Sequence, residues 1–330
     1  MAPKRVGIIG SFVWDVIHGR DTAAARSAPL EEWGGIAYSL AAFDAALGPG
    51  WESVPIVKVG EDLAGRARDY LRTLRRVAPD AAPVVVPHRN NRVTLVYRDA
   101  ERRTETLSGG VPGWTWAGLA PLVRGLDALY VNLMSGWELD LDTFRILRQQ
   151  FRGPIYCDIH SLSLDHRDGG ERSPQPVPDA GEWFRCMDIV QMNEDEMAMM
   201  ARDPLALSAM ALGAGASVLV VTLGARGAVY FAAPGFARLG DLGRGAGNRI
   251  SARGGPVRTA LARGVPARIP QGGDPTGCGD VWGATFFARL LDGDIMSDAL
   301  DAAMCAAARN VEHRGASGLA HHLRGELSHS

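Results

Sequence analysis

The stretch Gly-Gly-Asp-Pro-Thr-Gly-Cys-Gly-Asp at residues 272–280 places closely spaced glycines ahead of a carboxylate. Apolar side chains then recur at helical spacing, at Val281, Ala284, Ala288 and Leu291. The spacing predicts a glycine-rich loop that opens a helix, which Asp292-Gly293 would close.

A loop of this kind directs backbone N–H groups and the positive end of a helix dipole toward one point, which suits a phosphate. A carboxylate beside that phosphate, here Asp280, could take a proton from a hydroxyl that attacks phosphorus. The same pattern is also typical of an ordinary loop followed by a capping residue. The stretch alone leaves both interpretations open.

Composition bounds the class of protein. The chain has 330 residues, 46% of them hydrophobic and 22% charged, with a formal net charge of -2. A slightly negative net charge gives no electrostatic reason to expect binding to nucleic acid or to an anionic membrane. No apolar run approaches the roughly 20 residues of a membrane helix. The four cysteines form no Cys-x-x-Cys pair, so we expect a reduced, cytoplasmic protein.

Two common nucleotide-binding motifs are absent. Residues 5–10 read as a buried first strand, but Ser11-Phe12-Val13 follows where a dinucleotide fingerprint needs Gly-x-Gly-x-x-Gly. An NAD-linked enzyme is therefore disfavoured. No Gly-Lys pair occurs anywhere in the chain, which excludes a Walker P-loop. Phosphate handling must then come from the loop at residues 277–279.

The middle of the chain alternates strands and helices, which predicts a parallel sheet in an α/β fold. Strands are expected at residues 128–133, 155–159 and 217–222, and two more at 92–97 and 101–107 would form a hairpin. His160 follows one strand end, where ligands sit in such sheets. We interpret it as a structural histidine rather than a substrate ligand.

The sequence at residues 274–280 resembles the Asp-Thr-x-Gly-Ala-Gly-Asp signature of the ribokinase-like (PfkB) carbohydrate kinases, from which Pro275 and Cys278 depart. Further matches follow the family's order: an Asp after the first strand, a Gly-Gly-x-x-x-Asn-x-Ala element, an Asn-x-x-Glu motif and a Val-Thr-x-Gly segment. They fall at Asp15, Gly34-Gly35, Asn193 with Glu196, and Thr222 with Gly224. Ser39 stands where the family commonly has Asn.

This resemblance implies a ribokinase-like three-layer α/β/α fold with a mostly parallel central sheet. Residues 1–330 would form a single kinase domain carrying a small β lid from about 16–33 and 88–108. Lid closure would exclude water from the reaction. The resemblance also allows a homodimer formed through the lid.

The chemistry implied is ATP-dependent phosphorylation of a hydroxyl on a sugar or polyol. Asp280 would be the general base, and the amides of Gly277, Cys278 and Gly279 an anion hole. The resemblance assigns acceptor binding to Asp15, Gly34, Gly35 and Ser39. It assigns nucleotide binding to Asn193, Glu196, Thr222 and Gly224. Glu196 would also hold Mg²⁺ through waters, and a monovalent cation could bind near the strand leading to Asp274.

Other interpretations stay open. A nucleoside kinase would share every motif, and a non-catalytic ligand sensor could use the same fold. Residues 235–273 are rich in Gly and Arg, which indicates hairpins and loop. We expect the tail from His321 to Ser330 to be poorly ordered.

Overall fold

The computed structural model describes residues 2–18, 29–97, 103–165, 171–242, 255–268 and 273–326. A central sheet runs in the order β12-β11-β10-β9-β8-β7-β1-β3-β4. It is parallel except at its β10-β11-β12 end, which is antiparallel. The strands are β1 (Lys4–His18), β3 (Trp51–Gly60), β4 (Val84–Val86), β7 (Ala128–Asn132), β8 (Ile155–Asp158), β9 (Ile189–Asn193), β10 (Val218–Thr222), β11 (Gly227–Ala232) and β12 (Arg258–Arg263).

The middle strands are short apolar runs because helices cover both faces of the sheet. Every residue of β7 and β8 is buried. The helices are α1 (Ile36–Ala46), α2 (Ala64–Arg72), α3 (Trp116–Leu119), α4 (Leu141–Gln150), α5 (Ala180–Phe184), α6 (Glu194–Met200), α7 (Pro204–Ala214), α8 (Cys278–Leu291), α9 (Met296–Val311) and α10 (Leu319–Leu323). The 3₁₀ turns in the described ranges are η1 (His160–Ser163), η2 (Gly224–Arg226) and η3 (Leu239–Asp241).

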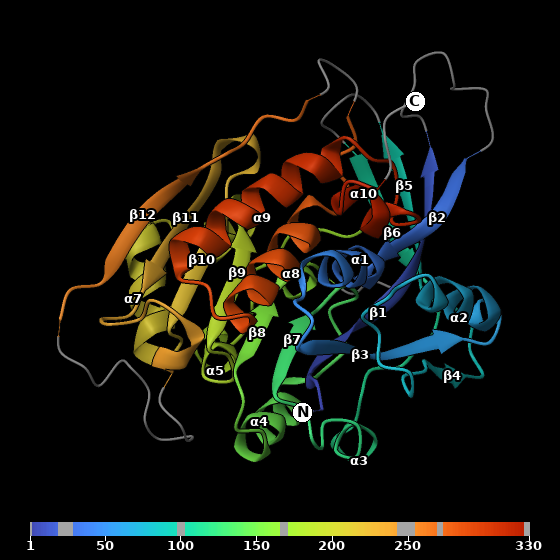
Figure 1. Cartoon of the computed structure of the whole chain (residues 1–330), viewed down its shortest axis with the longest axis horizontal. Coiled ribbons are helices and arrows are strands. Elements are labelled where there is room, and N and C mark those ends of the chain that lie inside the picture. The colour runs from blue at the N-terminus through green and yellow to red at the C-terminus, as the bar shows by residue number, and fades with distance from the viewer. Residues whose placement is uncertain are drawn as a thin grey trace.

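Helices α1, α8, α9 and α10 pack together on one face of the sheet (Figure 1). The helix that follows the glycine-rich loop, α8, lies at the centre of this layer and touches β7 and β8. Gly283 permits this approach, since a Cβ there would lie 2.2 Å from Gln191 Oε1 and 2.7 Å from the Tyr156 hydroxyl. The other layer includes α4, α5 and α7, and the expected three-layer, mostly parallel fold is confirmed.

Strand β1 is longer than the sequence indicated. It was expected over residues 5–10, but it continues without a break to His18, so Asp15 lies within the strand. The first part, Lys4–Ser11, pairs with β3 in the central sheet. The second part pairs with β2 (Leu30–Gly35) and β5 (Arg92–Tyr97), so one strand belongs to two sheets.

The small sheet is completed by β6 (Arg103–Ser108), antiparallel to β5 as the hairpin prediction required. Residues 98–102, where the hairpin turn is expected, and residues 19–28 of the expected lid lie outside the described residues. The same holds for 243–254 and 269–272 of the Gly/Arg-rich segment, which otherwise contributes β12. That these strands act as a lid on a single domain stays a prediction.

The C-terminal prediction was wrong for its first residues. His321 and His322 belong to α10, which contacts α1 and α9. His322 is buried and its ring stacks on His313. None of the helices in the described ranges has the length and apolar character needed to cross a bilayer.

Candidate active site

A cavity of about 320 Å³ opens at the carboxyl edge of the central sheet, beneath the small sheet. Its walls come from β1, β5 and β6 on one side, from β8 to β10 on another, and from the loop before α8. The lining includes Asp15, Gly35, Asn193, Glu196, Thr222, Gly224 and residues 275–280. Most of the residues predicted from the motifs therefore meet at one place, which is where parallel α/β sheets bind ligands.

The glycine-rich loop turns sharply into α8. Gly277 caps the helix with φ 75°, in the left-handed region that favours glycine. A Cβ there would also lie 2.3 Å from the ring of Tyr38. Asp274 holds the preceding turn by accepting a hydrogen bond from the Thr276 amide at 2.8 Å. The loop is therefore held at Asp274 by a hydrogen bond and at Gly277 by its left-handed conformation beside Tyr38.

The three amides of the expected anion hole differ. The Cys278 amide donates to the Pro275 carbonyl at 3.1 Å. In the part of the chain that the structure describes, neither the Gly277 amide nor the Gly279 amide donates a hydrogen bond to a backbone carbonyl. Both lie at the N-terminus of a 14-residue helix, where such amides and the helix dipole favour an anion. The amides at 277 and 279 are therefore the better donors for a phosphoryl oxygen.

Asp280 lies in the first turn of α8 and lines the cavity. Its Oδ1 accepts a hydrogen bond from Asn132 Nδ2 at 2.6 Å. Burial raises the pKa of Asp280 to about 6, against the lowering effects of the charge on His160 and the Asn132 hydrogen bond. A carboxyl group with a pKa near neutrality suits a general base.

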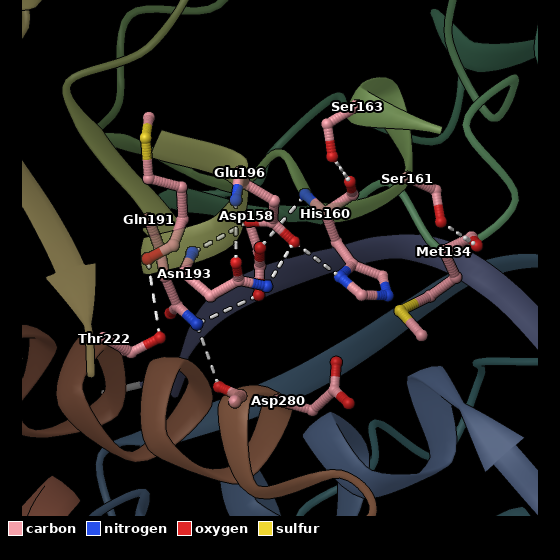
Figure 2. A network of polar contacts seen from close by, with 12 residues as sticks. Met134, Asp158, His160, Ser161, Ser163, Gln191, Asn193, Glu196, Thr222 and Asp280 are labelled. Carbon is pink, nitrogen blue, oxygen red and sulfur yellow. Dashed lines mark hydrogen bonds and ion pairs between the residues drawn. The ribbon is translucent and has the colours of Figure 1, made fainter. Parts of the chain in front are cut away.

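Figure 2 shows a polar network across the cavity from α8, around the ends of β8 and β9. Asn193 and Glu196 form a capping box at the start of α6. Glu196 Oε1 also meets His160 Nδ1 at 2.9 Å. His160 thus lines the cavity, with its imidazole held by Glu196, and the interpretation of it as a structural histidine rather than a substrate ligand stays a prediction.

Charge in this network is dominated by carboxylates. Burial lowers the pKa of His160, but the hydrogen bond and charge of Glu196, with Asp158 and Asp280, outweigh it and raise that pKa to about 10. Burial and the charge of Glu196 raise the pKa of Asp158. Among the described lining residues five are acidic, one is histidine and none is Lys or Arg. A polyanionic ligand would therefore need an accompanying cation.

Both oxygens of Glu196 already have partners. Oε1 accepts from Asn193 Nδ2 at 2.6 Å and contacts His160, and Oε2 accepts from the Asn193 amide at 2.8 Å. No group of three or more His, Cys, Asp or Glu side chains in the described ranges is arranged to hold a metal ion directly. The arrangement fits Mg²⁺ held through waters, as that ion prefers.

The acceptor side of the cavity is built on β1, β2 and α1. The carboxylate of buried Asp15 lies over Gly34, where a Cβ would be 1.9 Å from Asp15 Oδ2. Gly35 caps α1 with φ 57°. Ser39 is fully buried and is not among the described lining residues. It contacts Asn132 and Tyr130 instead, each at 3.4 Å.

Several cavity residues were missed by motif reasoning. Tyr38, Met134, Asp158 and Gln191 all line it. Asp158 and Gln191 lie at or near the ends of buried strands, so the rule that ligands bind at strand ends could have found them. The position of Tyr38 depends on which face of a helix meets the loop, which the sequence pattern did not indicate.

Comparison with known proteins agrees with this geometry. Residues 50–322 match the family model described as pfkB family carbohydrate kinase. No curated protein matches the sequence.

Solved structures with the same fold share little sequence with this chain. A nucleoside kinase of Burkholderia thailandensis in complex with inosine has a TM-score of 0.70 at 15% identity, covering 96% of this chain and 94% of its own. A pyrophosphate-dependent kinase of the ribokinase family, complexed with a pyrophosphate analogue and myo-inositol, has 0.69 at 15%, covering 94% and 96%. Arabidopsis thaliana ribokinase with ribose and ATP has 0.65 at 17%, covering 98% and 99%.

Proposed function

This chain belongs to the pfkB family of carbohydrate kinases, and from that premise we propose that it transfers a phosphoryl group from ATP to a hydroxyl of a small molecule. The acceptor that we propose is a sugar or sugar-like polyol. One observation carries the proposal. The buried carboxylate of Asp280 stands in the first turn of α8, beside the amides of Gly277 and Gly279, in the cavity that Asp15 also lines.

In this reaction Asp280 accepts the proton of the acceptor hydroxyl. The hydroxyl oxygen bonds to the γ-phosphorus, and the bond from phosphorus to the ADP oxygen breaks. The amides of Gly277 and Gly279, with that of Cys278 if its turn relaxes, stabilise negative charge on the transferring group. Asp15 and the backbone at Gly34-Gly35 hold the acceptor. Ser39 does not line the cavity and supports this side of it through its contacts with Asn132 and Tyr130.

The donor side is proposed at the ends of β9 and β10. The cavity is lined there by Asn193, Glu196, Thr222 and Gly224. Thr222 Oγ1 donates a hydrogen bond to the Met192 carbonyl at 3.4 Å. Glu196 would hold Mg²⁺ through waters, and the ion would offset phosphate charge that the acidic lining cannot. A monovalent cation near Asp274 and a homodimer through the small sheet remain proposals drawn from the resemblance alone.

A nucleoside kinase is the second candidate. It is favoured by the likeness to the kinase solved with inosine, whose fold this chain shares over nearly its whole length. A non-catalytic sensor is less favoured, since the loop, its glycines and Asp280 are all in place.

The test is phosphoryl transfer by the purified chain from Mg-ATP, or from magnesium pyrophosphate, to a panel of sugars, inositols and nucleosides. We expect turnover on one class with ATP, reduced about 10²–10⁴-fold in Asp280→Asn, as removal of a general base typically does. Binding of Mg-ATP, followed by calorimetry, should survive that change.

The outcomes separate the candidates. Turnover confined to nucleosides would select the second candidate, and turnover with pyrophosphate alone would change the donor. Binding of ATP without turnover of any acceptor would favour the sensor. Wild-type turnover by Asp280→Asn would show that another group is the base.

A further inference from the structure

We infer that Asn132, which no sequence motif singled out, is a positioning residue that fixes the orientation and proton affinity of the Asp280 carboxylate. Its catalytic consequence rests on the proposed function, whereas the contact itself does not.

The contact joins β7 to α8, the helix that packs against this strand. Asn132 is the last residue of β7 and has no exposed surface. Its Nδ2 donates to Asp280 Oδ1 at 2.6 Å and reaches Ser39 Oγ at 3.4 Å. Ser39 Oγ in turn donates to the Tyr130 hydroxyl at 3.4 Å. One amide therefore ties the sheet and α1 to the catalytic turn.

Asn132 acts on Asp280 and not on a ligand, because it is not among the described residues lining the cavity. A hydrogen bond to Oδ1 restricts rotation of the carboxylate and leaves Oδ2 for the acceptor hydroxyl. A base held in this way is ready for proton transfer without reorganisation.

Stability alone does not explain the choice of asparagine. The Oδ1 atom of Asn132 is buried and has no hydrogen-bond partner within the described structure. A buried acceptor without a partner costs free energy that an apolar side chain of similar size would avoid. The amide is therefore explained by what its Nδ2 does at Asp280.

Titratable groups from the elements around it face Asp280: His160 of η1, Asp158 and Tyr156 of β8, Glu196 of α6, Tyr130 of β7 and Tyr38 of α1. Burial raises the pKa of Asp280, while the His160 charge and the Asn132 hydrogen bond lower it. Loss of the Asn132 donor would leave burial less opposed, so the pKa of Asp280 would rise.

The first test needs no acceptor. The carboxyl ¹³C signals of aspartate-labelled full-length protein are titrated by NMR, with Asp280→Asn to assign the Asp280 signal. We expect the Asp280 midpoint to rise by about half to one pH unit in Asn132→Ala, the size of a lost charge-assisted hydrogen bond. Asn132→Ser, which is smaller but still polar, should show the same direction if the alanine variant folds poorly.

Asn91→Ala is the matched control. Asn91 is also fully buried, and its Nδ2 donates to Ser135 Oγ at 2.9 Å, away from Asp280. It should lose stability without moving the Asp280 midpoint. An unchanged midpoint in both Asn132 variants, or an equal shift in Asn91→Ala, would overturn the inference.

The second test uses the acceptor that the panel identifies. Asn132→Ser should lower kcat about 10- to 100-fold, leave the KM for Mg-ATP unchanged and move the acid limb of kcat/KM to higher pH. Exchanging the two side chains, in Ser39→Asn with Asn132→Ser, keeps the volume and returns an amide near Asp280, so part of kcat should return. A rise in KM for Mg-ATP with unchanged kcat would contradict a positioning role.

The two tests can fail independently. If the Asp280 titration midpoint shifts in the Asn132 variants but no acceptor is turned over, the coupling between Asn132 and Asp280 is supported. That result contradicts only the proposed kinase activity. Turnover by Asn132→Ser with wild-type pH dependence would contradict the coupling between Asn132 and Asp280. It would still support the proposed kinase activity.

Discussion

Asp280 has to be ionised to act as a base, and its surroundings work against ionisation. Burial raises its pKa to about 6, and the charge on His160 and the Asn132 donor only partly offset this. The deprotonated form dominates above that value and is lost as the pH falls through it.

We therefore expect kcat/KM to be level near pH 7–8 and to fall about tenfold per pH unit below about pH 6. The measurement is a pH profile with the acceptor that the panel identifies, and circular dichroism at each pH checks that the fold persists. Full activity retained to about pH 4 would show that Asp280 is not the base.

Gly277 is held to glycine by two separate constraints. Its φ of 75° is left-handed, and an added Cβ would lie 2.3 Å from the Tyr38 ring. Gly277→Ala should cost about 1–3 kcal/mol of stability through this strain and abolish most activity by displacing the loop.

Denaturant unfolding and the kinase assay together test the Gly277 prediction. Gly65→Ala is the control, since Gly65 is an exposed residue of α2 where an added Cβ would have no heavy atom within 4 Å. It should be neutral or slightly stabilising. Equal behaviour of the two variants would refute the constraint at Gly277.

At the scale of elements, β1 and α6 connect the fold to the site. Strand β1 leaves the central sheet after Ser11 and enters the small sheet, carrying Asp15 with it. Helix α6 begins with a capping box whose Glu196 also faces the cavity. The same side chains thus shape a helix end and line the site.

Asn193→Ala should cost about 0.5–2 kcal/mol, as loss of an N-cap does, and should raise the KM for Mg-ATP several-fold because Glu196 loses its orienting partner. Asp203→Ala is the matched control, because it also removes a helix N-cap. Asp203 caps α7 by accepting a hydrogen bond from the Leu205 amide at 2.9 Å, and it is not among the described residues that line the cavity.

Both variants should unfold earlier in denaturant, while only Asn193→Ala should change the KM. An equal KM change in both would mean that lost stability, and not the position of Glu196, affects nucleotide binding.

At the scale of the whole molecule, the C-terminal helix is anchored to the first helix by a buried ion pair. Arg324, which follows α10, bonds to Asp44 of α1, whose side chain has no exposed surface. Asp44 also accepts from the Arg76 amide at 2.6 Å. Three segments far apart in the sequence therefore meet at one carboxylate.

Arg324→Ala should destabilise the protein by about 3–5 kcal/mol, because it leaves a buried charge unpaired. Arg75→Ala removes an exposed partner of Glu326 in the same region and should cost no more than about 1 kcal/mol. Denaturant unfolding measures both. A small loss in Arg324→Ala would mean that water reaches Asp44 and that α10 is not firmly held.

The sequence by itself determined the features that local patterns encode. The glycines and carboxylate at 274–280 predicted a loop opening a helix, and alternating strands and helices predicted a parallel sheet. The hairpin strands were predicted from their pattern at 92–97 and 101–107, and the structure has them at 92–97 and 103–108. These predictions succeeded because glycine geometry, apolar periodicity and turn chemistry act between near neighbours in the chain.

Only the tertiary structure decided which residues meet. Asn132 and Asp280 are 148 residues apart, His160 reaches Glu196 from another strand end, and Ser39 lies behind the cavity. The continuation of β1 to His18 and the packing of α10 were equally hidden. No local pattern records such contacts, because they depend on strand order and on which helix face is buried, and both are settled only when the whole core packs.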